Sequence, residues 1–479
     1  MFKTRVSESE FDPTPVDGRQ AHGAARAALK RRDHDQAQAL LRESLLRQPE
    51  DAEALCLLAL ALWRGPGDLD SASVHLRLAR TLRPADPRIL TLSASLCLHL
   101  GELDSTWSFA EQALGADQQH APAYVVLARA NPRRIDEGQL KRMLSLASRV
   151  ELGAERLRPL HNAIGRVFDA RGEFDAAFGH FILSNRYATG RYEPAPRDAR
   201  LAEARELFTP DYFDQHRGYG IEDAGCVFVI GMPRSGSTLL EQVLAAHPQT
   251  DTCHESDALS NVETSWLRAL PAKRPDARFF EHYRAIEPAQ VARSAGDYLA
   301  ATARRMRKPN PCRRIDKRLG NFLFMPLITL MFPDAVVLHT HRHPLDVCLS
   351  CFTQGFDGHL YANDLAHLAH FYLNYQGYMR LWSTLFRASI RHCRYEDMIA
   401  AFEPQARSIV RSVGLEWDDA CAQPHRASRF VSTASAVQVR EPAHGARIER
   451  WRCYEKHLQP LIEGLGGHAN IERLHREFA

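Results

Sequence analysis

The chain has 479 residues, more than a single hydrophobic core usually supports, and so it predicts two or more domains. Hydrophobic residues at 45% and charged residues at 25% exclude a disordered or fibrous protein. The formal net charge of +3 gives no argument for a nucleic-acid partner, and we expect none. Residues 1–18 are polar where a signal peptide would be apolar, so we expect a flexible N-terminus there.

No apolar stretch approaches the ~20 residues that a membrane helix needs. The most apolar run, residues 322–332, is interrupted by Pro326, so we expect a cytoplasmic protein without membrane contact. Ten cysteines are scattered along the chain, and a reducing compartment disfavours disulfides. Cys348 and Cys351 form a CxxC pair, but no second pair lies at zinc spacing, so we expect no bound metal.

A repeat of about 34 residues runs through the N-terminal part of the chain. Similar tripeptides begin at Asp35, Asp70 and Asp104, at spacings of 35 and 34 residues. Small residues recur in step in both helices of each unit: Ala25, Ala59, Ala94, Ser44, Ala79 and Ala113. Small side chains let the two helices of a hairpin cross closely. The pattern predicts tetratricopeptide-type helical repeats over residues 19–187, with an unrelated helical bundle as the alternative.

The character of the sequence changes after a charged connecting segment, residues 188–224. Two short β-branched runs, CVFVI at residues 226–230 and AVVLHTH at residues 335–341, have amphipathic helical stretches between and after them. Strands that alternate with helices indicate a mainly parallel sheet. Residues 225–479 are therefore predicted to form an α/β domain.

A glycine-containing loop, GMPRSGST, lies between the first predicted strand and an amphipathic helix. Backbone N–H groups at a helix N-terminus, together with the helix dipole, form an anion site. The loop residues expected to hold a phosphate group are Pro233, Arg234, Ser235, Gly236, Ser237 and Thr238. A tight turn without a ligand is the alternative explanation of this loop.

The loop departs from the phosphate loop of nucleotide hydrolases. Those enzymes have a lysine where this chain has Ser237, and here the cation is Arg234. The second predicted strand ends at Arg342, with no acidic residue there to hold magnesium. Cations without metal ligands suit a sulfuryl group, which carries less charge than a terminal phosphoryl group.

Residues 229–248, VIGMPRSGSTLLEQVLAAHP, resemble the 5′-phosphosulfate loop of the sulfotransferase superfamily. In detail the chain is similar to tyrosylprotein sulfotransferases and to bacterial proteins that pair tetratricopeptide repeats with a sulfotransferase domain. The similarity extends in patches from about residue 227 to about residue 465. It implies an α/β P-loop sulfotransferase domain with 3′-phosphoadenosine 5′-phosphosulfate as co-substrate.

The resemblance also implies a catalytic set: Glu255, Arg234, Lys317 and Ser435. Arg234 would hold the phosphosulfate bidentately. Glu255 would take the proton of the acceptor hydroxyl, with the neighbouring His254 as a rival base. Lys317, assisted by Ser435, would stabilise the charge on the departing nucleotide. A surface acid and a surface lysine are the alternative interpretations of Glu255 and Lys317.

Further residues are implied to bind the nucleotide. Arg342 and Ser350 match the pair that holds the 3′-phosphate, at the carboxyl end of a strand. Tyr395 matches a tyrosine near the nucleotide, although a buried core tyrosine is an alternative. Arg450 would reach a phosphate, at a position where the family commonly has lysine. Residues 339–343 include three alternating histidines, which we interpret as structural rather than metal-binding.

Together these features predict a sulfotransferase that acts on an acceptor hydroxyl. The resemblance favours a tyrosine of a peptide or protein as acceptor, and a saccharide or small-molecule hydroxyl is the alternative. The other functions considered are a P-loop nucleotide kinase and an inactive scaffold that binds peptides. We expect the repeats to bind part of a peptide or protein acceptor, since repeat arrays present extended concave surfaces. Association into a homo-oligomer is left open.

Overall fold

A computed structural model describes residues 18–31, 33–65, 67–222, 224–270, 278–308, 310–356, 358–424, 445 and 448–478. The chain divides into two compact units, Met1–Ala130 and Asn131–Ala479. The described part of the first unit is entirely helical, and the second unit contains the sheet.

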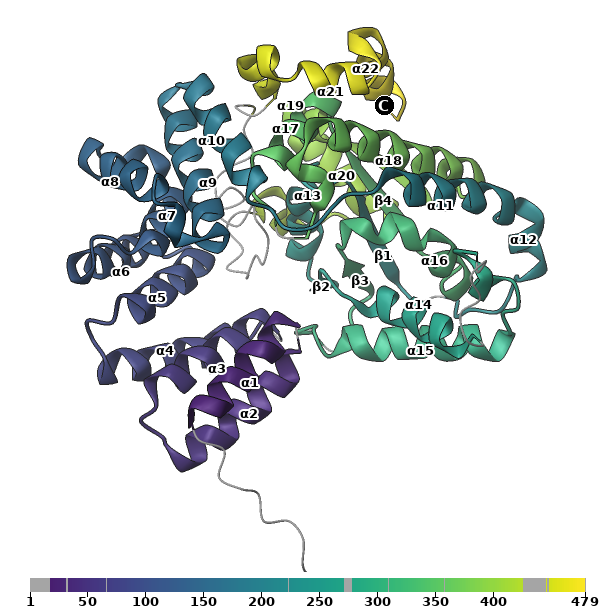
Figure 1. The fold of residues 1–479 in the computed structure, drawn as a ribbon. Helices are drawn as coiled ribbons and strands as arrows, with labels where there is room; N and C mark the ends of the chain where they lie inside the picture. The colour runs from purple at the N-terminus through teal and green to yellow at the C-terminus, as the bar shows by residue number, and fades with distance from the viewer. Residues whose placement is uncertain are drawn as a thin grey trace, which may run out of the picture. The chain divides into compact units, whose positions relative to one another are not determined.

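The first unit is an array of helical pairs (Figure 1). Its helices are α1 (Gly18–Lys30), α2 (His34–Arg47), α3 (Ala52–Arg64), α4 (Leu69–Leu82), α5 (Pro87–Leu100), α6 (Leu103–Ala116) and α7 (Ala121–Ala130). Asp35, Asp70 and Asp104 each stand at the second position of a helix, as the repeat predicts. Ala25 and Ala94 are fully buried, which fits the need for small residues between paired helices. The predicted array resembling tetratricopeptide repeats is confirmed.

The second unit begins with further helices before the sheet. They are η1 (Pro132–Arg134), α8 (Glu137–Ala147), η2 (Val150–Leu152), α9 (Ala154–Arg171), α10 (Phe174–Arg186), α11 (Pro194–Leu207) and α12 (Pro210–Gln215). Helix α9 is capped by Gly172, whose positive φ of 81° suits glycine, and α10 returns beside α9. This hairpin lies within residues 19–187, where the repeat pattern predicts helical pairs.

The α9–α10 hairpin packs on the α/β part of its own unit. The ring of Phe178 stacks on Phe352 with 5.4 Å between their centroids. The side-chain amide of Asn185 donates to the carbonyl oxygen of Phe352 at 3.0 Å. The compact unit therefore begins at residue 131 and includes a hairpin that the repeat pattern groups with the first unit.

The sheet has five parallel strands in the order β2-β3-β1-β4-β5. The strands are β1 (Cys226–Gly231), β2 (Thr250–His254), β3 (Arg313–Asp316), β4 (Val336–His341) and β5 (Ile390–Arg394). The α/β class with a parallel sheet, predicted from the sequence, is thus confirmed. Because all strands run the same way, their carboxyl ends lie along one edge, where such sheets place ligands.

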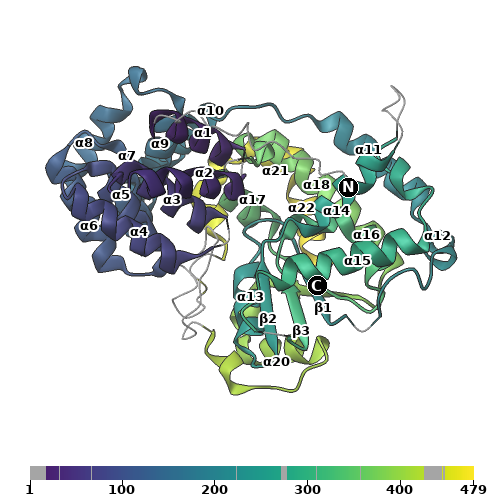
Figure 2. The same ribbon diagram turned by 90° about the horizontal axis from the view of Figure 1, so that it is seen from below.

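Helices cover both faces of the sheet, so β1 is buried along its whole length. On one face, Val227 and Val229 pack with residues of α13 (Ser237–Ala246) and α20 (Phe402–Ser412). On the other face, Phe228 and Ile230 join a larger core. The helices of that core include α14 (Ala258–Ala269), α15 (Pro288–Ala303), α16 (Met325–Met331) and α18 (Leu365–Leu385). Figure 2 shows α15 and α20 on opposite sides of the strands.

The remaining elements of the second unit are short or terminal. They are η3 (Glu281–Tyr283), η4 (Leu319–Phe324), α17 (Pro344–Phe352), η5 (Leu360–Asn363), α19 (Tyr395–Ala400), η6 (Asp419–Ala422), η10 (Arg450–His457), α21 (Gln459–Gly464) and α22 (Gly467–Arg476). Across the described ranges, no helix combines the length and apolar character needed to cross a membrane.

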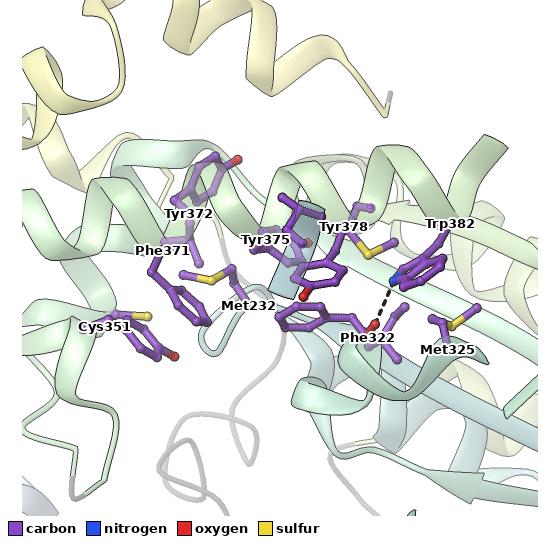
Figure 3. Close-up of a cluster of buried hydrophobic side chains, with 14 of the residues drawn as sticks. Met232, Phe322, Met325, Cys351, Phe371, Tyr372, Tyr375, Tyr378 and Trp382 are labelled. Atoms are coloured by element: carbon purple, nitrogen blue, oxygen red, sulfur yellow. Dashed lines mark hydrogen bonds between the residues drawn. The ribbon is translucent and has the colours of Figure 1, made fainter. Parts of the chain in front are cut away.

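The larger core anchors the loop that follows β1. Met232, the first residue of that loop, is only 2% exposed and belongs to the cluster of buried side chains in Figure 3. Tyr375, Tyr378 and Trp382 come to this cluster from α18, and the Trp382 indole donates to the carbonyl oxygen of Phe322 at 2.8 Å. Rigid aromatic packing therefore lies directly beneath the start of the predicted phosphate loop.

Candidate functional site

The predicted site residues lie at the carboxyl edge of the sheet. One of them follows each strand: Arg234 after β1, Glu255 after β2, Lys317 after β3, Arg342 after β4 and Tyr395 after β5. Parallel strands bring these positions to one edge although they are spread over more than a third of the sequence. Their contacts form two groups, one around the loop that follows β1 and one around Lys317.

The phosphate loop has the backbone that an anion site requires. Gly236 has a φ of 99° and stands just before α13, so the loop leads directly into a helix N-terminus. Arg234 also has a positive φ, 71°, which is uncommon for a residue with a side chain. Ser235 is buried, and its hydroxyl oxygen lies 2.6 Å from that of Thr340 on β4. This contact joins the loop to the neighbouring strand.

Helix α17 holds the loop from a second side. The Arg234 Nε donates to the hydroxyl oxygen of Ser350 at 3.0 Å, across 116 residues of sequence. The Cys351 thiol donates to the carbonyl oxygen of Pro233 at 3.2 Å. Ser237 and Thr238 form the first turn of α13, and both are buried. The structure therefore brings the loop residues and Ser350 together.

Tyr395 lies between the loop and Arg342. A Cβ atom added at Gly236 would lie 2.5 Å from the Tyr395 ring, so only glycine allows this close approach. On its other side, the Arg342 guanidinium lies 4.8 Å from the centroid of the same ring. Arg342 is also 3.4 Å from the carboxylate of Asp346, measured between Nη2 and Oδ2. The ring of Tyr395 is only half-buried, which is unlike a core tyrosine.

Two predicted residues are not brought to this group by the described contacts. Ser435 lies outside the described residues. Arg450, on η10, pairs with Asp169 Oδ1 at 2.7 Å and covers the Phe174 ring at 4.8 Å. These contacts attach Arg450 to the α9–α10 hairpin, and its role as a phosphate ligand stays a prediction.

The second group is centred on Lys317. Its side chain is 1% exposed, and its Nζ lies 2.7 Å from Glu255 Oε1 and 3.7 Å from Glu241 Oε2. Burial disfavours the charged form of Lys317, but the two carboxylates outweigh burial and raise its pKa above the usual value. Lys317 is therefore not the surface lysine that the sequence left as an alternative. Glu255, in contrast, is half exposed, with 53% of its side chain accessible.

Sequence reasoning missed Glu241, which stands on α13 one turn beyond the loop. Its Oε1 accepts a hydrogen bond from the Thr252 hydroxyl at 2.8 Å and lies 3.0 Å from His254 Nδ1. Burial acts to raise the pKa of Glu241, but Lys317, His254 and Thr252 prevail and lower it to about 2. The available signal was an acid inside the apolar run LLEQVL, and an amphipathic helix could equally have turned it to solvent.

The end of β2 is irregular at the residues that face this group. The pairing of β2 with β3 shifts between Thr252 and His254, and His254 has a positive φ of 55°. A non-glycine residue in this conformation costs free energy and persists only where its surroundings fix it. The carbonyl oxygen of His254 accepts from the Lys317 backbone N–H at 2.9 Å, so the strained turn sets Glu255 beside Lys317.

The alternating histidines of β4 contact aromatic and histidine side chains. His339 Nδ1 lies 2.7 Å from His392 Nδ1, and its Nε2 pairs with the Tyr375 hydroxyl. Burial lowers the pKa of His341 to about 3, with a further contribution from His392. The ring of His343 stacks on Trp451 with 5.6 Å between centroids. These contacts are those of packed structural side chains.

Comparison with known proteins gives a family match for part of the second unit. Residues 226–419 match the model of the sulfotransferase family. An uncharacterized protein of Aquifex aeolicus (strain VF5) is 30% identical to this chain over 304 residues. The alignment covers 62% of this chain and 40% of the Aquifex protein, so the chain spans about two fifths of that relative.

Two solved structures are similar to separate parts of the chain. The sulfotransferase domain of the Synechococcus PCC 7002 olefin synthase is 18% identical, covering 54% of this chain and 94% of that domain, with a TM-score of 0.37. MamA is 16% identical, covering 34% of this chain and 93% of MamA, with a TM-score of 0.27. Neither likeness bears on what this chain binds.

Proposed function

We propose that the second unit is a sulfotransferase, which moves a sulfuryl group from 3′-phosphoadenosine 5′-phosphosulfate to an acceptor hydroxyl. The family match supports sulfuryl transfer in general. The observation that carries the proposal is the pair of Lys317 and Glu255 at 2.7 Å beside a phosphate loop. A buried cation and an exposed carboxylate in contact are the two groups that the transfer needs.

The loop and α17 would hold the two ends of the donor. The N-terminus of α13 and the Arg234 guanidinium suit the 5′-phosphosulfate, because both offer several N–H donors to one anion. Arg342 and Ser350 suit the 3′-phosphate, and because Arg234 is hydrogen-bonded to Ser350, the two proposed subsites would lie next to each other. Tyr395, with its ring between Gly236 and Arg342, would border the nucleotide.

The transfer itself would be an in-line displacement at sulfur. The acceptor oxygen forms a bond to sulfur while the bond from sulfur to the bridging phosphate oxygen breaks. Glu255 takes the acceptor proton, and Lys317 stabilises the negative charge that gathers on the departing oxygen. Catalysis then consists of positioning and charge stabilisation, as in phosphoryl transfer.

For the acceptor, we propose the tyrosine hydroxyl of a peptide or protein. The similarity of the loop to tyrosylprotein sulfotransferases supports this choice, and so does an array of helical pairs able to bind an extended peptide. A phenol with a pKa near 10 loses its proton with difficulty at neutral pH, which gives Glu255 its task. The half-exposed position of Glu255 leaves it open to an acceptor from solvent.

Calorimetry with the product nucleotide, 3′-phosphoadenosine 5′-phosphate, tests the donor site. We expect this nucleotide to bind with micromolar or tighter affinity in excess chelator, because the cations proposed to hold its phosphates are side chains rather than a metal ion. Absent binding there, together with tight binding of magnesium-ATP, would instead favour a nucleotide kinase. Sulfur-labelled donor offered with a tyrosine peptide, a saccharide and a small phenol then tests the acceptor.

A further inference from the structure

Glu241 is a buried carboxylate for which the reaction above has no use. Only 6% of its side chain is exposed, yet it stands on the helix that begins at the phosphate loop. Its two oxygens are directed to different partners: Oε1 to Thr252 and His254, and Oε2 toward Lys317. Burying a charged group this deeply costs free energy unless its partners compensate for it. The presence of Glu241 at this position therefore calls for an explanation.

Lys317 lies between two carboxylates of different exposure. Glu255 is half exposed, and Glu241 is buried. In the structure, Glu255 Oε1 accepts a hydrogen bond from Lys317 Nζ and is therefore not free to accept one from an acceptor hydroxyl. For Glu255 to take a proton from the acceptor, the Lys317–Glu255 contact has to loosen.

The donor supplies the charge that loosens this contact. A phosphosulfate bound beside Lys317 brings negative oxygens that compete with Glu255 for the ammonium group. Lys317 is fully buried, and a cation there without a counter-charge would tend to lose its proton. Glu241 can remain in contact with Lys317 throughout, because its carboxylate is buried with the lysine, whereas Glu255 is half exposed.

We propose that Glu241 is a positioning residue of this site. It keeps Lys317 charged and in place while Glu255 is released, and it holds His254 as the tautomer with the proton on Nδ1. This inference rests on the proposed function, because it assigns Glu241 to the same transfer step. Among the described residues, the charged groups paired with Lys317 are Glu241 on α13 and Glu255 after β2, and His254 contacts the other oxygen of Glu241.

The contact with Glu241 also sets the chemistry of His254. An ionised carboxylate only accepts hydrogen bonds, so a neutral His254 donates from Nδ1 and carries its lone pair on Nε2. This gives the strained turn a second proton acceptor next to Glu255. The tautomer of His254 therefore depends on Glu241, because the Nε2–H tautomer would leave the buried carboxylate without this hydrogen-bond donor.

The variant Glu241→Gln tests the role in catalysis. We expect kcat to fall roughly 10²-fold through misplacement of Lys317, with little change in the Kd of 3′-phosphoadenosine 5′-phosphate. We also expect the alkaline limb of the kcat–pH profile to move to lower pH, because Lys317 loses one of its two carboxylates. Thr252→Val is the matched control: it removes a hydrogen bond to Glu241 but no charge, and the alkaline limb should stay in place.

The outcomes separate this inference from the proposed function. If the wild-type chain neither binds the nucleotide nor transfers sulfuryl groups, the proposed function fails. If the wild type is active and Glu241→Gln has the wild-type pH profile, the positioning role fails while the function stands. If Thr252→Val shifts the kcat–pH profile as much as Glu241→Gln does, the shift comes from a change in local structure and not from the loss of charge. That result would also overturn the positioning role of Glu241.

A measurement on the wild-type chain applies even if Glu241→Gln does not fold. Nitrogen NMR of histidine-labelled protein distinguishes the two neutral tautomers, and loss of one signal in His254→Gln assigns it. We expect the Nδ1–H tautomer for His254. The Nε2–H tautomer would mean that His254 does not donate to Glu241, and would overturn the inference.

Discussion

The helical pairs of the first unit and the carboxyl edge of the sheet in the second unit are built from contacts of different range. In the first unit, helices are capped by aspartates a few residues away, as when Asp51 accepts from the backbone of Glu53 and Ala54. At the sheet edge, Arg234 meets Ser350 across 116 residues, and Lys317 meets Glu255 across 62. Short-range contacts repeat with the sequence period, whereas long-range contacts exist only after the sheet has formed. Substitutions at the edge should therefore act on catalysis, and changes in the repeats should leave the chemistry intact.

The largest expected effect is at Glu255. Glu255→Gln keeps the shape of the side chain but cannot take a proton, so we expect turnover to fall ~10²–10⁴-fold, the usual share of general-base catalysis. The Kd of the product nucleotide should hardly change, because Glu255 is assigned to the acceptor. Steady-state transfer assays and calorimetry measure the two quantities. Near-normal turnover in Glu255→Gln, with activity abolished in His254→Ala, would move the role of base to His254.

Lys317 is expected to contribute both to catalysis and to folding. Lys317→Ala removes the cation from the departing oxygen, and we expect kcat to fall roughly 10²–10³-fold. It also leaves Glu241 buried without its cation, so unfolding free energy should drop by ~3–5 kcal/mol. Lys456→Ala is the control, because its ammonium group pairs with Asp175 at the surface with 67% exposure. There the loss should be small, because solvent screens an exposed ion pair. Equal stability of the two variants in denaturant titrations would contradict the buried role of Lys317.

The same contrast between short-range and long-range contacts explains how much of the fold could be predicted from the sequence. The repeat period placed Asp35, Asp70 and Asp104 at helix starts because a helical pair is specified within about 34 residues. The parallel sheet was also predictable, since β-branched runs alternate with helical segments. The boundary between the units was not, because the packing of Phe178 on Phe352 is not visible in a repeat period.

The site was predictable only in part, and mostly through resemblance. Motif positions indicated Arg234 and Lys317, but nothing in the sequence showed that Lys317 is buried between two carboxylates. Glu241 was missed because a single acid in an apolar helix looks the same whether it faces solvent or a buried cation. The contact of Arg450 with Asp169 spans 281 residues, and no local pattern predicts it.

The buried histidines of β4 should make the second unit sensitive to acid. Burial, aided by His392, lowers the pKa of His341 from its ordinary value of 6.5 to about 3. As the pH falls below about 6.5, the unfolded chain therefore binds a proton that the folded chain does not, and stability is lost down to about pH 3. At pH 5 this one group should cost about 2 kcal/mol relative to neutral pH. In His341→Phe, the slope of unfolding free energy against pH between pH 7 and 5 should decrease by about the contribution of one bound proton. An unchanged slope would contradict this assignment.

The smallest expected effect is on nucleotide binding when the first unit is removed. A chain of residues 131–479 keeps the compact second unit, including the α9–α10 hairpin that supports α17 through Phe178 and Asn185. Because α17 carries Ser350, we expect the Kd of 3′-phosphoadenosine 5′-phosphate to match that of the full chain. A chain that begins near Gly220 lacks this hairpin and should bind the nucleotide more weakly or fail to fold.

Activity on an acceptor should respond differently to the same truncation. If the helical pairs bind part of a peptide or protein acceptor, residues 131–479 should lose kcat/KM on a long peptide while retaining it on a short phenol. Binding to the helical pairs would help position the long acceptor, whereas a small phenol is too short to make those contacts and so should be unaffected by their removal. Parallel assays on both acceptors, with a thermal melt to verify folding, measure this difference. Equal kcat/KM on the long peptide with and without the first unit would show that the repeats do not select the acceptor.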